Sequence, residues 1–142
     1  MSQSTTLITG ISGFIARHCA LEMLRAGYPV RGTVRSSAKA ENVRASLARH
    51  ADVSALEFAE ADLTADTGWQ AAMTGCENVL HVASPFPAGQ PKDEQVLIRP
   101  AVEGTLRVLR AASAAGISRF VQTSSMVAVM YGHAPGRIAP FN

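Results

Sequence analysis

The stretch Thr9-Gly10-Ile11-Ser12-Gly13-Phe14-Ile15-Ala16 decides the fold of this chain. It follows the apolar pair Leu7-Ile8 and precedes an amphipathic stretch that ends at Ala26-Gly27, so it predicts a tight turn between a β-strand and an α-helix. Such a turn presents backbone N–H groups and a helix N-terminus to a phosphate. Without a ligand, the same spacing can serve as a plain strand–helix turn, and that alternative stays open at this point.

Three small residues give this turn its expected chemistry. Gly10 can adopt a tight backbone angle, Gly13 has no Cβ to keep a pyrophosphate away, and Ala16 lets the helix pack close to the strand. The segment therefore predicts a dinucleotide site at the end of the first strand.

Strand-like and helix-like segments alternate along the rest of the chain. Strands are expected at residues 5–9, 28–34, 56–59, 79–83 and 120–123, and helices after the first turn and at 38–49, 67–73 and 94–115. This alternation implies parallel βαβ units with right-handed crossovers. The expected fold class is α/β, a Rossmann-type doubly wound parallel sheet, with a loop from Tyr131 onward.

Composition limits the class of protein. The 142 residues make one domain, and the 47% hydrophobic and 17% charged content suits a buried parallel sheet. The net charge of +2 is spread along the chain, so neither a nucleic acid nor a membrane is an expected partner.

Cysteine usage and the N-terminal residues predict the compartment. Cys19 and Cys76 lie far apart without CxxC spacing, which favours a reducing compartment and argues against a metal site. Residues 1–4 are short and polar, and no apolar run approaches about 18 residues. A cytoplasmic protein is expected.

The end of the second strand bears on cofactor choice. An NAD-preferring site usually carries Asp or Glu there for the ribose 2′-hydroxyl, whereas this chain has Arg35, with Lys39 close behind. A guanidinium suits a 2′-phosphate through forked, charge-assisted hydrogen bonds. A solvated surface arginine is the plain alternative.

Three further strand ends carry side chains that can meet a ligand. Asp62 can bind the adenine amino group, or it can cap the next helix. The small segment Val82-Ala83-Ser84 can let the cofactor ribose approach the backbone. A hydroxyl of Thr123-Ser124-Ser125 can bind a substrate carbonyl beside a nicotinamide, although serines at strand ends are also ordinary caps and turn formers.

Other chemistry-bearing side chains are expected to be structural. His81 lies inside an apolar strand and is predicted to be a hydrogen-bonded core histidine rather than a catalytic one. His18 and Cys19 fall on the first helix. Met126 and Met130 are expected to pack rather than to line a cofactor site.

These motifs together resemble the N-terminal part of extended short-chain dehydrogenase/reductases, specifically the dihydroflavonol 4-reductase and cinnamoyl-CoA reductase group. The resemblance covers almost the whole chain, and the order and spacing of the segments make it specific. The segments that carry it are residues 9–16, Gly32-Thr33-Val34-Arg35, Ala61-Asp62-Leu63, His81-Val82-Ala83-Ser84-Pro85, Val102-Glu103-Gly104-Thr105 and Thr123-Ser124-Ser125.

The resemblance implies an NADPH-dependent reductase of aldehydes or ketones that acts on a small-molecule carbonyl substrate. It assigns the catalytic serine to Ser125 and the 2′-phosphate to Arg35, with Lys39 as a less constrained neighbour. It places Asp62 and Leu63 by the adenine and implies a homodimer as one candidate assembly, since relatives often pair through helices. The pyrophosphate side is assigned to Gly10, Ser12, Gly13, Phe14 and Ile15, and the ribose to Val82, Ala83 and Ser84.

One departure separates this sequence from the group. The Tyr-x-x-x-Lys pair that donates the proton is absent, because the residues four positions after Tyr28 and Tyr131 are Gly32 and Pro135. The expectation is therefore that residues 1–142 are the NADP-binding N-terminal portion of a longer reductase, with a sheet incomplete at its C-terminal side and no substrate domain. Two alternatives stay open: a non-catalytic NADP(H)-binding module, and a nucleotide-sugar epimerase of the same superfamily.

Overall fold

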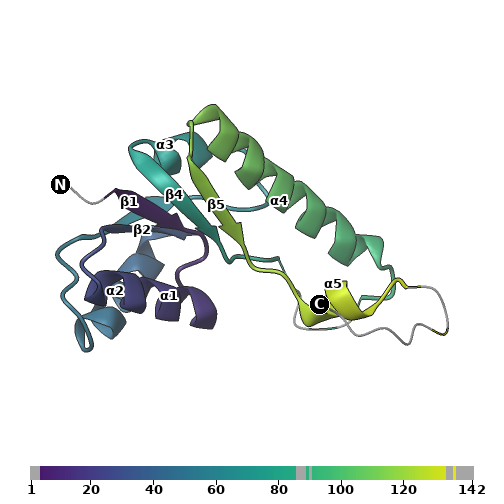
Figure 1. Ribbon diagram of the computed structural model, residues 1–142, viewed down its shortest axis with the longest axis horizontal. Coiled ribbons are helices and arrows are strands. Elements are labelled where there is room, and N and C mark those ends of the chain that lie inside the picture. The colour runs from purple at the N-terminus through teal and green to yellow at the C-terminus, as the bar shows by residue number, and fades with distance from the viewer. Residues whose placement is uncertain (1–3, 86–88, 90, 134–135, 137–142) are drawn as a thin grey trace.

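The computed structural model describes residues 4–85, 89, 91–133 and 136. Its elements alternate along the chain, as Figure 1 shows. They are β1 (Thr5–Ile8), α1 (Phe14–Arg25), β2 (Val30–Val34), α2 (Ser37–Ala48), β3 (Leu56–Glu60), α3 (Trp69–Met73), β4 (Cys76–His81), α4 (Gln95–Ala114), β5 (Arg119–Gln122) and α5 (Met126–Met130).

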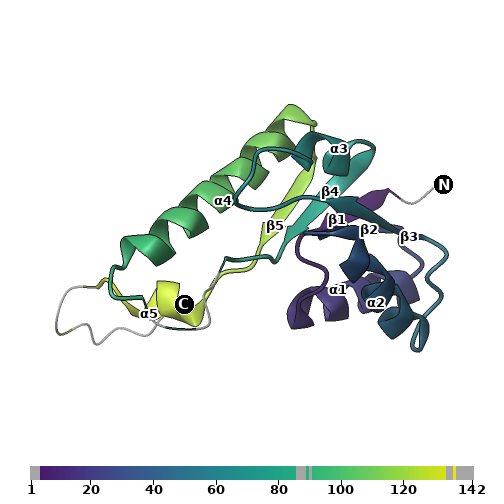
Figure 2. The ribbon, with the colours of Figure 1, turned by 180° about the vertical axis from the view of Figure 1, so that it is seen from behind.

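The five strands form one parallel sheet with the order β3-β2-β1-β4-β5. The crossover from β3 to β4 reverses the direction in which strands are added, which is the doubly wound arrangement. Helices α1 and α2 cover one face, and α3 and α4 cover the other (Figures 1 and 2). The α/β fold class predicted from the sequence is confirmed.

Two cores lie on the two faces of the sheet. Successive side chains of a strand point to opposite faces, so Ile8 packs beneath α1 and α2 while Leu7 packs beneath α3 and α4. Both side chains are fully buried. This explains why the central strands are apolar throughout rather than alternating.

Most element boundaries agree with the predictions to within a few residues, and the differences have local causes. The second strand begins at Val30 rather than residue 28, since Pro29 has no N–H to give to a neighbouring strand. The third helix begins at Trp69 rather than residue 67, because Gly68 has a φ of 87° that no helix accommodates. The fourth strand ends at His81 rather than residue 83, because the next two N–H groups donate to the side chain of Thr9 and not to a neighbouring strand.

The end of the chain departs from prediction. Helix α5 lies where the sequence pattern predicts no helix, and the expectation that Met126 and Met130 pack is wrong, because their side chains are 73% and 47% exposed. Within the described residues, none of the helices is long and apolar enough to cross a membrane.

Candidate functional site

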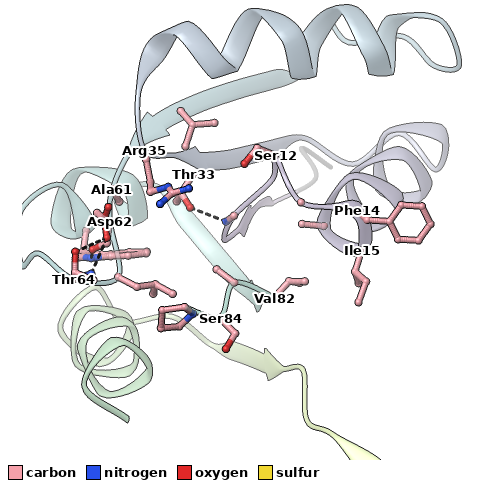
Figure 3. Close-up of a pocket in the computed structure, with 18 residues that line it drawn as sticks. Ser12, Phe14, Ile15, Thr33, Arg35, Ala61, Asp62, Thr64, Val82 and Ser84 are labelled. Carbon is pink, nitrogen blue, oxygen red and sulfur yellow. Dashed lines mark hydrogen bonds between the residues drawn. The ribbon is translucent and has the colours of Figure 1, made fainter. Parts of the chain in front are cut away.

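A cavity of about 600 Å³ opens where the carboxyl ends of β1, β2, β3 and β4 meet (Figure 3). Its volume is in the range of small-molecule and cofactor sites. It brings together almost all the residues predicted from the sequence: Gly10, Ser12, Gly13, Phe14, Ile15, Arg35, Asp62, Leu63, Val82, Ala83 and Ser84. Lys39 and Ser125 do not line it.

The turn after β1 is held by backbone and side-chain hydrogen bonds. Gly10 has a φ of 66°, and its N–H donates to Thr33 Oγ1 over 2.9 Å (Figure 3). The N–H of Gly13 closes the turn by donating to the carbonyl of Gly10 over 2.8 Å. The predicted tight angle at Gly10 is therefore observed, and it is secured by Thr33, a residue whose role has no signal in the sequence.

Ile11 anchors the turn from below. Its side chain is fully buried, and its N–H donates to the carbonyl of Thr33 over 3.1 Å. A Cβ added to Gly32 would lie 2.4 Å from Ile11 Cδ1, so only glycine at that position in β2 leaves room for the anchor.

The cavity side of the turn is left open. A Cβ on Gly13 would meet only the carbonyl oxygen of Gly10, at 3.3 Å. The side chains of Phe14 and Ile15 are 79% and 57% exposed, and the Phe14 ring points away from the cavity in Figure 3. Helix α1 has no side-chain cap, so its first N–H groups face the cavity and can bind an anion.

The segment after β4 is held by Thr9. Its Oγ1 accepts the N–H groups of Val82 and Ala83, both over 3.0 Å, and lies 2.9 Å from Nδ1 of His81. These two N–H groups are taken from the sheet, which is why β4 ends at His81. With both acceptor positions of Thr9 used, its hydroxyl proton goes to His81 Nδ1.

His81 is therefore a neutral, buried imidazole. Burial lowers its pKa from the usual value of 6.5, because the charged form loses its hydration. The prediction of a hydrogen-bonded core histidine is confirmed by these contacts. The hydrogen bonds between Thr9 and the residues from His81 to Ala83 hold β1 and β4 together at the edge of the sheet where the cavity opens.

Arg35 is the exposed cation of the cavity wall. It follows β2 directly, and in Figure 3 it points into the space between the turn and the loop that carries Asp62. Among the described residues no hydrogen bond or ion pair reaches its guanidinium. Its charge is close enough to help lower the pKa of Asp62. The cavity thus offers an unpaired guanidinium and no acidic residue at the end of β2.

Asp62 forms a local turn rather than a helix cap. Its Oδ1 accepts both the N–H and the hydroxyl of Thr64, each over 2.8 Å. These bonds lower the pKa of Asp62 and keep it ionised. Because α3 begins only at Trp69, the alternative that Asp62 caps the next helix is wrong. The carboxylate still borders the cavity (Figure 3).

Side chains of α3 and α4 hold the loop that carries Asp62 in place. The indole N–H of Trp69 donates to the carbonyls of Asp62 and Ala65, over 3.0 and 3.1 Å. Arg107 of α4 donates to the carbonyl of Leu63 and pairs with Asp66. These contacts, like the lining residues Thr64 and Trp69, have no sequence signal of their own, since they depend on how α3 and α4 pack.

Lys39 and Ser125 lie outside the cavity. Lys39 is an exposed residue of the first turn of α2. Ser125 is exposed and precedes α5, where its Oγ accepts the N–H of Val127 over 3.2 Å. Within the described residues, Ser125 therefore acts as an ordinary helix cap, which is the alternative that the sequence left open for a serine at a strand end.

Comparison with known proteins gives consistent matches over nearly all of the chain. The chain is 37% identical over 125 residues to a dihydroflavonol 4-reductase of Hordeum vulgare, covering 87% of this chain and 35% of the relative. It is 39% identical over 122 residues to cinnamoyl-CoA reductase 1 of Oryza sativa subsp. japonica, covering 86% and 34%. It thus spans about a third of the length of these relatives.

A solved structure agrees with the fold. The yeast methylglyoxal/isovaleraldehyde reductase Gre2, complexed with NADPH, matches with a TM-score of 0.76 and 30% identity over 89% of this chain and 38% of that one. The resemblance to the dihydroflavonol 4-reductase and cinnamoyl-CoA reductase group is confirmed. The model of the NAD dependent epimerase/dehydratase family matches residues 6–142, and the chain belongs to this family.

Proposed function

We propose that residues 1–142 form the NADP(H)-binding domain of a reductase that acts on aldehydes or ketones. The observation that carries the proposal is the unpaired guanidinium of Arg35 on a dinucleotide-sized cavity that has no acidic residue at the end of β2. A forked donor of fixed charge favours a phosphate over a ribose hydroxyl. The NADPH in the yeast structure that this chain resembles supports the same cofactor.

Each wall of the cavity has a role in this proposal. The open turn at Gly10, Ser12 and Gly13, with the backbone of Phe14 and Ile15, holds the pyrophosphate at the start of α1. Arg35 binds the 2′-phosphate, and Lys39, exposed in the first turn of α2, adds a second positive charge after β2. The adenine lies against Asp62 and Leu63, and a ribose lies against Val82, Ala83 and Ser84.

NADPH, when bound, supplies hydride for reduction of a carbonyl carbon. The protein must then orient the carbonyl and provide a proton for its oxygen. Ser125 can do the first task, because its Oγ accepts the N–H of Val127 and its own hydroxyl proton is left to donate. No Tyr-x-x-x-Lys pair is present in the 142 residues, so orienting the carbonyl is the one catalytic task that the proposal assigns to these residues.

The same proposal implies a substrate, a partner and a cellular compartment. A small-molecule carbonyl compound is the substrate, and a second copy is a candidate partner. The two cysteines are free, which suits the reducing conditions of the cytoplasm.

The test is a comparison of NADPH and NADH binding by calorimetry in the full protein, before and after Arg35→Ala. A hydrogen bond to a charged group is worth about 1.5–3 kcal/mol, so we expect about 10- to 100-fold weaker NADPH binding and unchanged NADH binding. Arg49→Ala, an exposed arginine at the end of α2 that does not line this cavity, is the matched control. Equal affinity of the unmodified protein for both nucleotides would contradict the proposal.

A further inference from the structure

A second cavity, of about 430 Å³, lies in the groove between α1 and α2. Arg17, His18 and Leu21 contribute to it from α1, and Ser46 and His50 contribute from α2 and the residues just after it. It borders the first cavity, since Ser12 and Phe14 line both. The cofactor proposed above does not use it.

Arg17 contributes a polar group without a partner. Its Nε is buried and has no hydrogen-bond acceptor among the described residues. No ion pair reaches its guanidinium within the same residues. Nε is enclosed, so a ligand in the cavity would meet the two terminal nitrogens of Arg17, which make no hydrogen bond among the described residues either. Because donors in folded proteins are almost always satisfied, a half-buried guanidinium with no acceptor beside a cavity points to an acceptor that arrives from outside.

The surrounding groups suit an oxyanion. His18 of α1, Ser46 of α2 and His50 just after α2 add imidazole and hydroxyl groups, and none of the lining residues is acidic. Glu22, the acidic residue of α1, is paired with Arg25 at 2.9 Å. A planar guanidinium with further donors around it matches the several oxygens of a phosphate.

The rest of the lining is apolar. Leu21, Leu47 and Phe14 border the same space, and the Phe14 ring meets the His18 ring edge-on at a centroid distance of 4.7 Å. A free inorganic ion would leave these three apolar side chains in contact with water. We propose that the groove between α1 and α2 binds a phosphate monoester of a small apolar alcohol, held by Arg17 beside the cofactor cavity.

Phenyl phosphate is the probe, titrated into the full protein while the imidazole NMR signals of His18 and His50 are recorded. We expect saturable shifts of both signals, and about 10-fold or weaker binding in Arg17→Gln. Ser46→Asp, which places a negative charge on the opposite wall, should weaken binding as well. Arg110→Gln, an exposed arginine of α4 on the other face of the sheet, is the charge-matched control and should bind normally.

Two further titrations distinguish this site from its alternatives. Benzyl alcohol, which lacks the phosphate, should leave the imidazole signals unshifted, and equal shifts would overturn the proposal. Phenyl phosphate should still bind when the protein is saturated with NADPH, and displacement by NADPH would assign Arg17 to the cofactor cavity instead. Unchanged binding in folded Arg17→Gln would also overturn it. Failure of NADPH to bind would contradict only the proposed function.

Discussion

A Cβ added to Gly10 would lie 2.8 Å from Cβ of Ala83, although the two residues are separated by about half of the chain. This contact joins the turn after β1 to the segment after β4, the two inner walls of the cavity. It depends on the hydrogen bonds from Val82 and Ala83 to Thr9, which draw that segment toward β1. The two walls therefore come this close only because both residues are small.

Gly10→Ala should destabilise the protein and weaken NADPH binding together. The φ of 66° is strained for alanine, and the added methyl group overpacks against Ala83, for a combined loss of about 2–4 kcal/mol in the free energy of unfolding. Gly75→Ala separates the two causes, because Gly75 has a φ of 75° but nothing within 4 Å of a Cβ. Urea denaturation of both variants measures the difference. Equal losses would show that Ala83 imposes no constraint.

Gly13→Val should abolish cofactor binding while the fold survives. The backbone of Gly13 is extended, and its Cβ position touches only the Gly10 carbonyl, so a side chain there projects toward the site of the phosphates. We expect NADPH affinity to fall more than about 10-fold by calorimetry, and Gly13→Ala to fall less. Circular dichroism checks the fold. Undiminished affinity in folded Gly13→Val would leave the turn without a role in binding.

The Thr9–His81 clamp should make stability depend on pH. The pKa of His81 is lowered in the folded state, so below its ordinary value of 6.5 the unfolded chain binds more protons. The free energy of unfolding should be at its full value above pH 6.5 and fall as the pH drops below it. His81→Gln, which can still accept from Thr9, should flatten that slope between about pH 7.5 and about pH 5.5.

The control for this pH experiment is His50→Gln, which changes an exposed histidine outside the clamp. It should keep the slope of the unmodified protein. Identical slopes in His81→Gln and the unmodified protein would assign the acid sensitivity to other groups.

If the proposed reductase function holds, Ser125→Ala should reduce turnover in the full protein without displacing its cofactor. Loss of an oriented donor to a developing oxyanion lowers kcat by about 100-fold, while KM for NADPH stays unchanged. Ser124→Ala is the adjacent control and should retain activity. If both alanine variants turn over carbonyl compounds like the unmodified protein, Ser125 acts only as the cap of α5.

The 142-residue polypeptide by itself should self-associate and show no reductase activity. Val102, Leu106 and Leu109 on α4 and Val121 on β5 are 37–51% exposed, and large apolar side chains that are exposed together favour association. Size-exclusion chromatography with light scattering should find oligomers that Leu106→Glu with Leu109→Glu reduces. Phe14→Glu, at the start of α1, should leave them in place. A monomeric unmodified polypeptide, or one that consumes NADPH with an aldehyde, would contradict this expectation.

Local sequence determined the five strands, the first four helices and the turn of this protein, but not the short helix α5. The apolar pair before Gly10, the spacing to Ala16 and the alternation of apolar runs with amphipathic segments act over a few residues, where backbone sterics and hydrogen bonding are decided. For the same reason, the sequence alone places Arg35 and Asp62 at strand ends. Because the carboxyl ends of parallel strands share one edge, their convergence on one cavity follows.

Only the tertiary structure decided how these pieces fit. That Ile11 requires Gly32, that Gly10 abuts Ala83, and that Arg107 fastens the loop of Asp62 depend on contacts between segments far apart in the chain. The same holds for the buried Nε of Arg17, which has no hydrogen-bond partner among the described residues. Such contacts leave no periodic signal in the sequence, since each depends on the shape and burial of a residue that the chain brings near only when the sheet is assembled.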